Sequence, residues 1–161
     1  MTPQQFEQLI LTHRRPLELF AAQWTTTPED CVQDAFLKLF RNPVDVANHR
    51  AWLFRAVRNL AIDSGRSETS RKQREQSVGQ NRKLFAESND NSLDLNELQS
   101  ALEHLPDDQR EVIVARTWGK LTFEEISEAF GIATSTAHRR YETGILQLQK
   151  HFEIPTRTSH E

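Results

Sequence analysis

Apolar residues recur every three or four positions along most of the chain, which is the spacing of amphipathic helices. Residues 1–24 show this spacing and predict one or two helical segments, with a helix start or a kink at Pro16. A second helix is expected over about residues 28–40, because Pro28 suits the first turn of a helix. Its inward apolar positions are Val32, Ala35, Phe36 and Leu39.

A third helix is predicted after the break at Asn42-Pro43 and a loop of about ten residues. Over residues 51–66 one face is apolar, and the opposite face consists of Trp52, Arg55, Asn59, Asp63 and Arg66. A ring that can stack on a base, beside guanidinium groups that neutralise phosphates, is typical of a surface for single-stranded nucleic acid. In the alternative interpretation Trp52 packs in the core and the arginines are only solvated.

A polar linker and a second domain follow. Residues 67–93 are rich in Ser, Gln, Asn, Arg, Lys and Glu, which predicts a flexible linker. Apolar spacing then returns at Leu95, Leu98, Leu102 and Leu105, and Pro106 restarts a helix. The pattern predicts an all-α chain of two small helical domains, residues 1–66 and 94–152, followed by a polar tail over 153–161.

Residues 122–145 contain two helical patterns separated by a glycine. Thr122 and Glu125 form a capping box, in which the hydroxyl and the carboxylate each bind a free amide of the first turn. Gly131 supplies the left-handed residue that ends this helix. The arrangement predicts a helix-turn-helix at the end of the second domain. The alternative is a helical bundle whose last helix merely has a polar outer face.

Hydrogen-bonding and mostly cationic side chains form the outer face of the last helix, at Ser135, His138, Arg139 and Glu142. In a helix-turn-helix the N-terminal part of the second helix enters the major groove of DNA, where such side chains reach base edges and phosphates. The pattern therefore favours a DNA-binding function.

Charge is distributed unevenly along the 161 residues. The net charge is −3, but the two signs are separated along the chain. Residues 50–83 hold nine Lys or Arg and three Asp or Glu, whereas residues 84–111 hold one Arg and eight Asp or Glu. DNA responds to the nearest charged face, because salt screens charges beyond about 8 Å. Cys31 is the only cysteine, which excludes an internal disulfide. With no long apolar run and no leader, we expect a cytoplasmic protein without membrane insertion.

The outer face of the second helix is acidic and carries one apolar residue. It consists of Asp30, Gln33, Asp34 and Leu37. Paired carboxylates can perform acid–base chemistry, but no His, Lys or metal-ligand set accompanies these two, so catalysis is not predicted. A solvated face is one interpretation. The exposed Leu37 favours the other, a docking face for a partner.

Three stretches resemble a known family. The sequences PEDCVQDAFLKLF (residues 28–40) and AWLFRAVRNLAID (51–63) closely resemble region 2 of the extracytoplasmic function (ECF) sigma factors. The sequence ALEHLPDDQREV (101–112), with the helix-turn-helix, is similar to their region 4. The resemblance implies a non-enzymatic subunit that directs bacterial core RNA polymerase to promoters and assists DNA opening. It implies no metal or cofactor, and an anti-sigma factor is a further candidate partner.

The same resemblance implies three binding sites. The clamp coiled coil of the polymerase would bind the acidic face at Asp30, Gln33, Asp34 and Leu37. The −10 promoter element would be recognised by the loop over 43–50 and the polar stripe, with the candidates Asn48, Arg50, Trp52, Arg55, Asn59, Asp63 and Arg66. The −35 element would be faced by Thr134, Ser135, Thr136, His138, Arg139, Arg140, Glu142 and Thr143, with Arg140 nearer the DNA backbone.

Two residues depart from the family pattern. Ala133 stands where relatives usually have a serine or similar cap, so capping falls to Thr134 or is absent. Glu142 stands where relatives often carry a cationic or other polar residue, and its carboxylate either accepts from a cytosine amine or points away from DNA.

Other functions stay open besides the sigma factor. One is a helix-turn-helix repressor or activator that acts without polymerase, and another is an interaction module that does not read DNA. If the sigma interpretation holds, the polymerase must keep both domains on one DNA, because base contacts worth about 1–3 kcal/mol each cannot select a promoter alone. We therefore expect the free chain to bind promoter DNA poorly.

Overall fold

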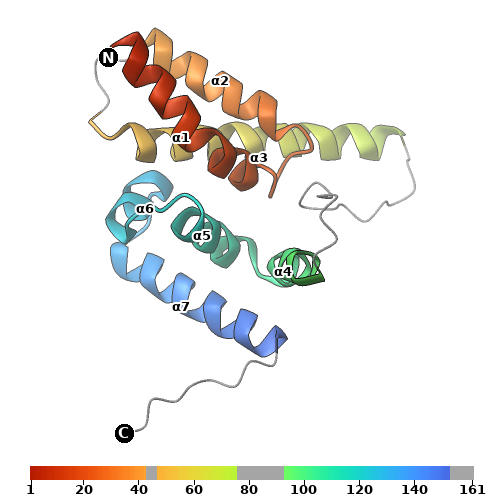
Figure 1. Ribbon diagram of the computed structural model, residues 1–161. Coiled ribbons are helices and arrows are strands. Elements are labelled where there is room, and N and C mark those ends of the chain that lie inside the picture. The colour runs from red at the N-terminus through yellow and green to blue at the C-terminus, as the bar shows by residue number, and fades with distance from the viewer. Residues whose placement is uncertain (43–46, 76–92, 153–161) are drawn as a thin grey trace, which may run out of the picture.

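The computed structural model describes residues 1–42, 47–75 and 93–152, and all regular structure in these residues is helical. Its helices are α1 (Pro3–Ala21), α2 (Pro28–Arg41), α3 (His49–Glu75), α4 (Leu93–His104), α5 (Asp107–Thr117), α6 (Phe123–Phe130) and α7 (Thr134–His151). Helices α1–α3 form one group and α4–α7 a second (Figure 1). The predicted all-α fold is confirmed.

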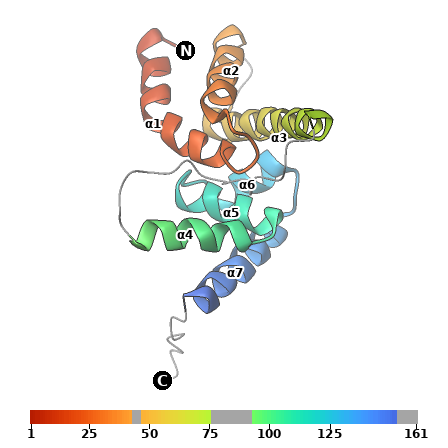
Figure 2. The ribbon, with the colours of Figure 1, turned by 90° about the vertical axis from the view of Figure 1, so that its right-hand side faces the viewer.

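The N-terminal group packs three helices around aromatic and aliphatic side chains. Helix α1 begins with a capping box between Thr2 and Gln5, and Pro16 lies inside this helix rather than at a helix start. Figure 2 shows α1 bent along its length, as expected of an internal proline, which removes one backbone hydrogen bond. Helix α2 begins at Pro28, as predicted, and buries its predicted inward residues. The fully buried side chains of this group include Leu17, Phe20, Leu39, Leu53, Phe54 and Val57.

Helix α3 is longer than the apolar pattern predicted. It begins at His49, and the Asn48 side chain accepts a hydrogen bond from the Ala51 amide, so Asn48 caps the first turn. It continues through residues 67–75, which the sequence analysis assigned to the linker. The Glu68 carboxylate accepts hydrogen bonds from the hydroxyls of Thr25 and Thr26, which holds this part of α3 against the turn between α1 and α2.

The C-terminal group ends in the predicted helix-turn-helix. Thr122 and Glu125 form both bonds of the capping box at 3.1 Å, and Gly131 adopts the left-handed conformation with φ 66°. Helix α7 follows with Ala133 as its N-cap and no side-chain cap. Of the two expectations for this start, the absence of a cap is therefore correct.

A shared core joins the two groups, a feature that the sequence analysis did not predict. Helix α3 packs against α6 and α1 against α5, and Figures 1 and 2 show α5 and α6 directly beside the N-terminal helices. The rings of Phe20 and Phe130 stack with centroids 5.7 Å apart. Gly119 permits this approach, because a Cβ there would lie 2.5 Å from the Phe54 ring and 2.6 Å from the Ala115 carbonyl oxygen.

Candidate polymerase and promoter interfaces

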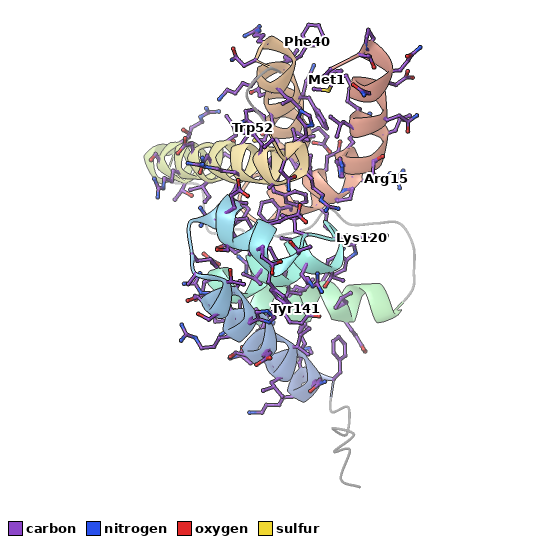
Figure 3. The ribbon with its side chains drawn as sticks, turned by 90° about the vertical axis from the view of Figure 1, so that its left-hand side faces the viewer. Met1, Arg15, Phe40, Trp52, Lys120 and Tyr141 are labelled. Carbon is purple, nitrogen blue, oxygen red and sulfur yellow. The ribbon has the colours of Figure 1, made fainter. Side chains whose placement is uncertain are left out.

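The predicted docking face on α2 is exposed in full. Asp30, Gln33, Asp34 and Leu37 all lie at the surface, on the side of α2 opposite its buried residues. Phe40, which the sequence analysis did not select, is 64% exposed and contacts the Phe6 ring at a centroid distance of 5.4 Å. Figure 3 places Phe40 at the end of α2 that is remote from the C-terminal group. An acidic face with Leu37 and Phe40 along it is suited to a partner with basic and apolar groups.

The polar stripe on α3 is only partly solvent-exposed. Arg55, Asn59, Asp63 and Arg66 are exposed, whereas Trp52 is half-buried and packs against the core. Figure 3 shows Trp52 on α3 within the N-terminal group. The packing of Trp52 agrees with the alternative interpretation for that residue, and the four exposed side chains still form a continuous polar surface beside it.

Asn48 and Arg50 lie apart from that stripe and contact the helix-turn-helix instead. Arg50 donates from both sides of its guanidinium fork to Glu125, from Nη2 to Oε1 at 2.8 Å and from Nε to Oε2 at 3.1 Å. The Asn48 amide donates to Glu125 Oε2 at 3.0 Å. Glu125 is 8% exposed and keeps its capping bonds as well. The remaining loop candidates at 43–46 lie outside the described residues.

A second ion pair between the two groups involves residues that the sequence analysis missed. Arg58 Nε donates to Glu111 Oε2 at 2.8 Å, and its guanidinium lies 5.4 Å from the Phe130 ring centroid. Glu111 is buried, and this burial raises the pKa of its carboxyl group although Arg58 opposes the shift. The apolar run over residues 112–115 could have indicated this contact between the groups, because a helix that is apolar on all sides must be covered by neighbours on all sides.

A buried arginine makes a further polar contact across the groups. Arg110 on α5 is 4% exposed and donates from Nε to the side-chain oxygen of Gln23, in the turn after α1, over 3.2 Å. It also donates to the Leu105 carbonyl and to the Asp107 carboxylate. Its donors are thus shared between the turn after α1 and the residues around the start of α5.

Burial and hydrogen bonds act in opposite directions on Glu125. Burial alone raises the pKa of its carboxyl group, but hydrogen bonds from the Thr122 backbone amide, Arg50 and Asn48 together lower that pKa below its ordinary value. The pKa of His13, on α1 near this pair, is also lowered, first by burial and then by the Arg50 charge, while Glu125 raises it. The ionised carboxylate and the neutral imidazole are therefore the favoured forms in the folded chain.

Most predicted reading residues on α7 face solvent. Ser135, His138, Arg139, Glu142 and Thr143 are exposed, and Thr134, Thr136 and Arg140 are half-buried. Arg140 lies 3.6 Å from Asp108, and the His138 ring contacts the Phe123 ring in a tilted arrangement at a centroid distance of 3.7 Å. The Arg116 guanidinium lies 4.7 Å from the same Phe123 ring. This ring contact places His138 against the start of α6.

Two absences concern the part of the chain that the structure describes. There, no group of three or more His, Cys, Asp or Glu side chains is placed to bind a metal ion. No helix in those residues is long and apolar enough to cross a membrane.

Comparisons with known proteins agree with this architecture. Residues 9–71 match the family model of Sigma-70 region 2, and residues 101–150 match that of Sigma-70, region 4. Together these matches cover well over half of the chain, which belongs to the sigma-70 family, the sigma factors that bind core RNA polymerase and promoter DNA. The region 2 match precedes the region 4 match along the chain, and the protein is a sigma factor of ECF type. No curated protein sequence matches the chain.

Two solved structures illustrate the likeness. The sigma factor RpoE of Bartonella quintana, in complex with the anti-sigma factor NepR, is 26% identical with a TM-score of 0.77, over 94% of this chain and 98% of that one. CnrH, in complex with the cytosolic domain of CnrY, is 23% identical with a TM-score of 0.68, over 96% of this chain and 92% of that one. The second comparison concerns the fold alone.

Proposed function

We propose that this sigma factor uses three separate surfaces to direct core polymerase to its promoters. The acidic face of α2, with Asp30, Gln33, Asp34 and Leu37, binds the polymerase. The outer face of α7 reads the −35 element. The polar surface of α3, together with Asn48 and Arg50 at the start of this helix, reads the −10 element. The observation that carries the proposal is that all four side chains of this α2 face are exposed, whereas the opposite side of the helix is buried.

DNA opening in this proposal requires no catalytic residue. A surface that binds the unpaired strand better than the duplex shifts the equilibrium toward the open form. The chain then acts by binding alone, in the cytoplasm where core polymerase works, and is not an enzyme. A few weak base contacts are enough to select a promoter, because the polymerase holds both regions on one DNA.

An anti-sigma factor belongs among the proposed partners. The structure of RpoE, whose match extends over nearly the whole of this chain, was solved in complex with the anti-sigma factor NepR. Such a partner would compete with polymerase for this chain.

Run-off transcription with bacterial core polymerase tests the proposal. The wild type should produce discrete start sites on a library of promoter fragments, and Asp30→Lys with Asp34→Lys should abolish them, because the reversed charges repel a basic partner. The matched control reverses two exposed carboxylates elsewhere, Glu7→Lys with Glu97→Lys, and should transcribe like the wild type. Transcription that never depends on the protein, together with duplex binding by the free chain, would favour a regulator that acts without polymerase.

A further inference from the structure

The Glu125 carboxylate accepts hydrogen bonds from Asn48 and Arg50, two residues that are proposed to bind the −10 element. Three hydrogen bonds of 2.8–3.1 Å join its carboxylate to Asn48 and Arg50. We propose that the start of α6 is an internal binding surface for Asn48 and Arg50 of region 2. On this surface the Glu125 carboxylate takes the place of a DNA phosphate or base edge. The free chain thus masks part of its own −10 surface. This inference rests on the proposed function.

The chemistry of the contact resembles DNA recognition. An arginine fork binds carboxylate and phosphate in the same two-pronged geometry, and an amide side chain reads base edges. Both Glu125 oxygens accept from the Arg50 fork, and one also accepts from Asn48. The Nε–Nη2 edge of Arg50 and the bound N–H of Asn48 cannot donate to DNA and to Glu125 at the same time, so DNA and α6 compete for them.

The masking contact continues along α3. Arg58 lies about two helical turns beyond Arg50 and pairs with the buried Glu111 of α5. Each of these arginines from region 2 therefore binds one carboxylate from region 4. Phe130 lies against Arg58 and stacks on Phe20, which extends the same contact into the core.

The interface combines apolar and charged contacts. Phe20 and Phe130 contribute apolar burial, whereas desolvation of the two ion pairs costs free energy that their Coulomb attraction only partly offsets, so loss of one partner of a pair weakens the interface. When the regions separate, all four charged side chains regain water. Binding of polymerase or DNA to the separated form can then shift the equilibrium toward opening.

Glu125→Gln tests the mask without removing the helix cap. Glutamine at this position still completes a capping box, whereas the charged fork to Arg50 is lost. The control is Glu124→Gln, because Glu124 is exposed on the same turn. Fluorescence labels at Gln8 on α1 and Gln147 on α7, in a Cys31→Ala background, report the separation of the two regions by energy transfer.

The expected result has two parts. Glu125→Gln should lower the transfer efficiency and strengthen binding of a labelled single-stranded DNA pool of about 12 nucleotides by about tenfold. Arg50→Gln removes the same ion pair from the other side, so it should also lower the transfer efficiency but should not strengthen DNA binding. Glu124→Gln should behave like the wild type in both measurements.

The measurements separate this inference from the proposed function. Energy transfer is recorded without DNA or polymerase, so unchanged transfer in both Glu125→Gln and Arg50→Gln overturns the contact as a determinant of closure. Lower transfer with no gain in DNA affinity in Glu125→Gln overturns the mask. If no variant binds single-stranded DNA, the −10 assignment and the mask both fail, while run-off transcription still tests the polymerase role by itself.

Discussion

The side chain of His13, near the Arg50–Glu125 pair, interacts with charges from both groups of helices. His13 on α1 lies close to Arg50 from α3 and to Glu125 from α6, and burial together with Arg50 lowers its pKa. A histidine in this position adds a third titratable group to a contact that already depends on an ionised carboxylate. The local charge balance therefore changes within the range of pH in which imidazole titrates.

His13 should make the stability of the chain fall as the solution becomes acidic. Because the folded pKa lies below the ordinary value of 6.5, the stability contribution of His13 is present above 6.5 and is lost as pH falls through the folded pKa. The wild type should accordingly lose more free energy of unfolding than His13→Gln between about pH 7 and about pH 5. Urea unfolding at several pH values measures this difference.

The two glutamates do not obscure that comparison. The lowered pKa of Glu125 gives stability that is present above 4.5 and lost as pH falls through its folded pKa, whereas the raised pKa of Glu111 gives stability that is lost as pH rises through its folded pKa. Both effects occur in the wild type and in His13→Gln and largely cancel in the difference. Parallel pH dependence of the two proteins would contradict the prediction.

Helix α7 packs against α5 at a glycine. Gly144 is buried, and a Cβ at this position would lie 2.5 Å from Ile113 Cδ1. Gly144→Ala gains about 1 kcal/mol of helix propensity but forces Ile113 to move, and overpacking of this kind costs about 1–3 kcal/mol. We expect the single substitution to destabilise the chain and the same substitution in an Ile113→Val background, where Cδ1 is absent, to stabilise it.

A double-mutant cycle by urea unfolding measures this coupling. Gln147→Ala, at an exposed position of the same helix, is the control and should add to Ile113→Val without coupling. Equal effects of Gly144→Ala in both backgrounds would show that Ile113 does not limit the approach of α5 and α7.

Sequence patterns predicted helices where the determining groups are neighbours in the chain. The capping box at Thr122 and the left-handed Gly131 are local features, and both are present as predicted. The end of α3 was placed too early, because residues 67–75 are polar and are held by Glu68 contacts with threonines 42 and 43 positions away. A pattern read along one helix contains no information about such a partner.

For the candidate sites, the sequence predicted which side chains are exposed better than which side chains meet. The acidic face of α2 and most of the outer face of α7 are at the surface, as their spacing predicted. The partner of Arg50 is 75 positions away and the partner of Arg58 is 53 positions away. Arg58 also falls between the apolar and polar faces of α3, so periodicity gave no reason to select it. Their roles in binding polymerase and DNA stay predictions.

At the scale of the whole molecule, the shared core should make the two groups unfold together. Phe130 of α6 is almost fully buried against Phe20 of α1. Phe130→Ala should lower the free energy of unfolding by about 3–5 kcal/mol, as for other buried phenylalanines. Hydrogen exchange should then increase in α1 and α3 as well as in α6.

Leu146→Ala provides the control for this prediction. Leu146 is 53% exposed on α7, so its truncation should change stability by no more than about 0.5 kcal/mol. Faster exchange confined to α6 and α7 in Phe130→Ala would show instead that the two groups are energetically independent.

The paired charges between α3 and the C-terminal helices also limit how the two halves can be recombined. A hybrid that joined residues 1–75 of this chain to region 4 of a relative would inherit Arg50 and Arg58 with whatever side chains stood opposite them. Where those were not carboxylates, both halves could fold, yet two arginines would be left at the contact without their ion-pair partners and only its apolar part would be retained. Exchange of halves among such proteins should therefore be tolerated best where carboxylates stand at the positions of Glu111 and Glu125.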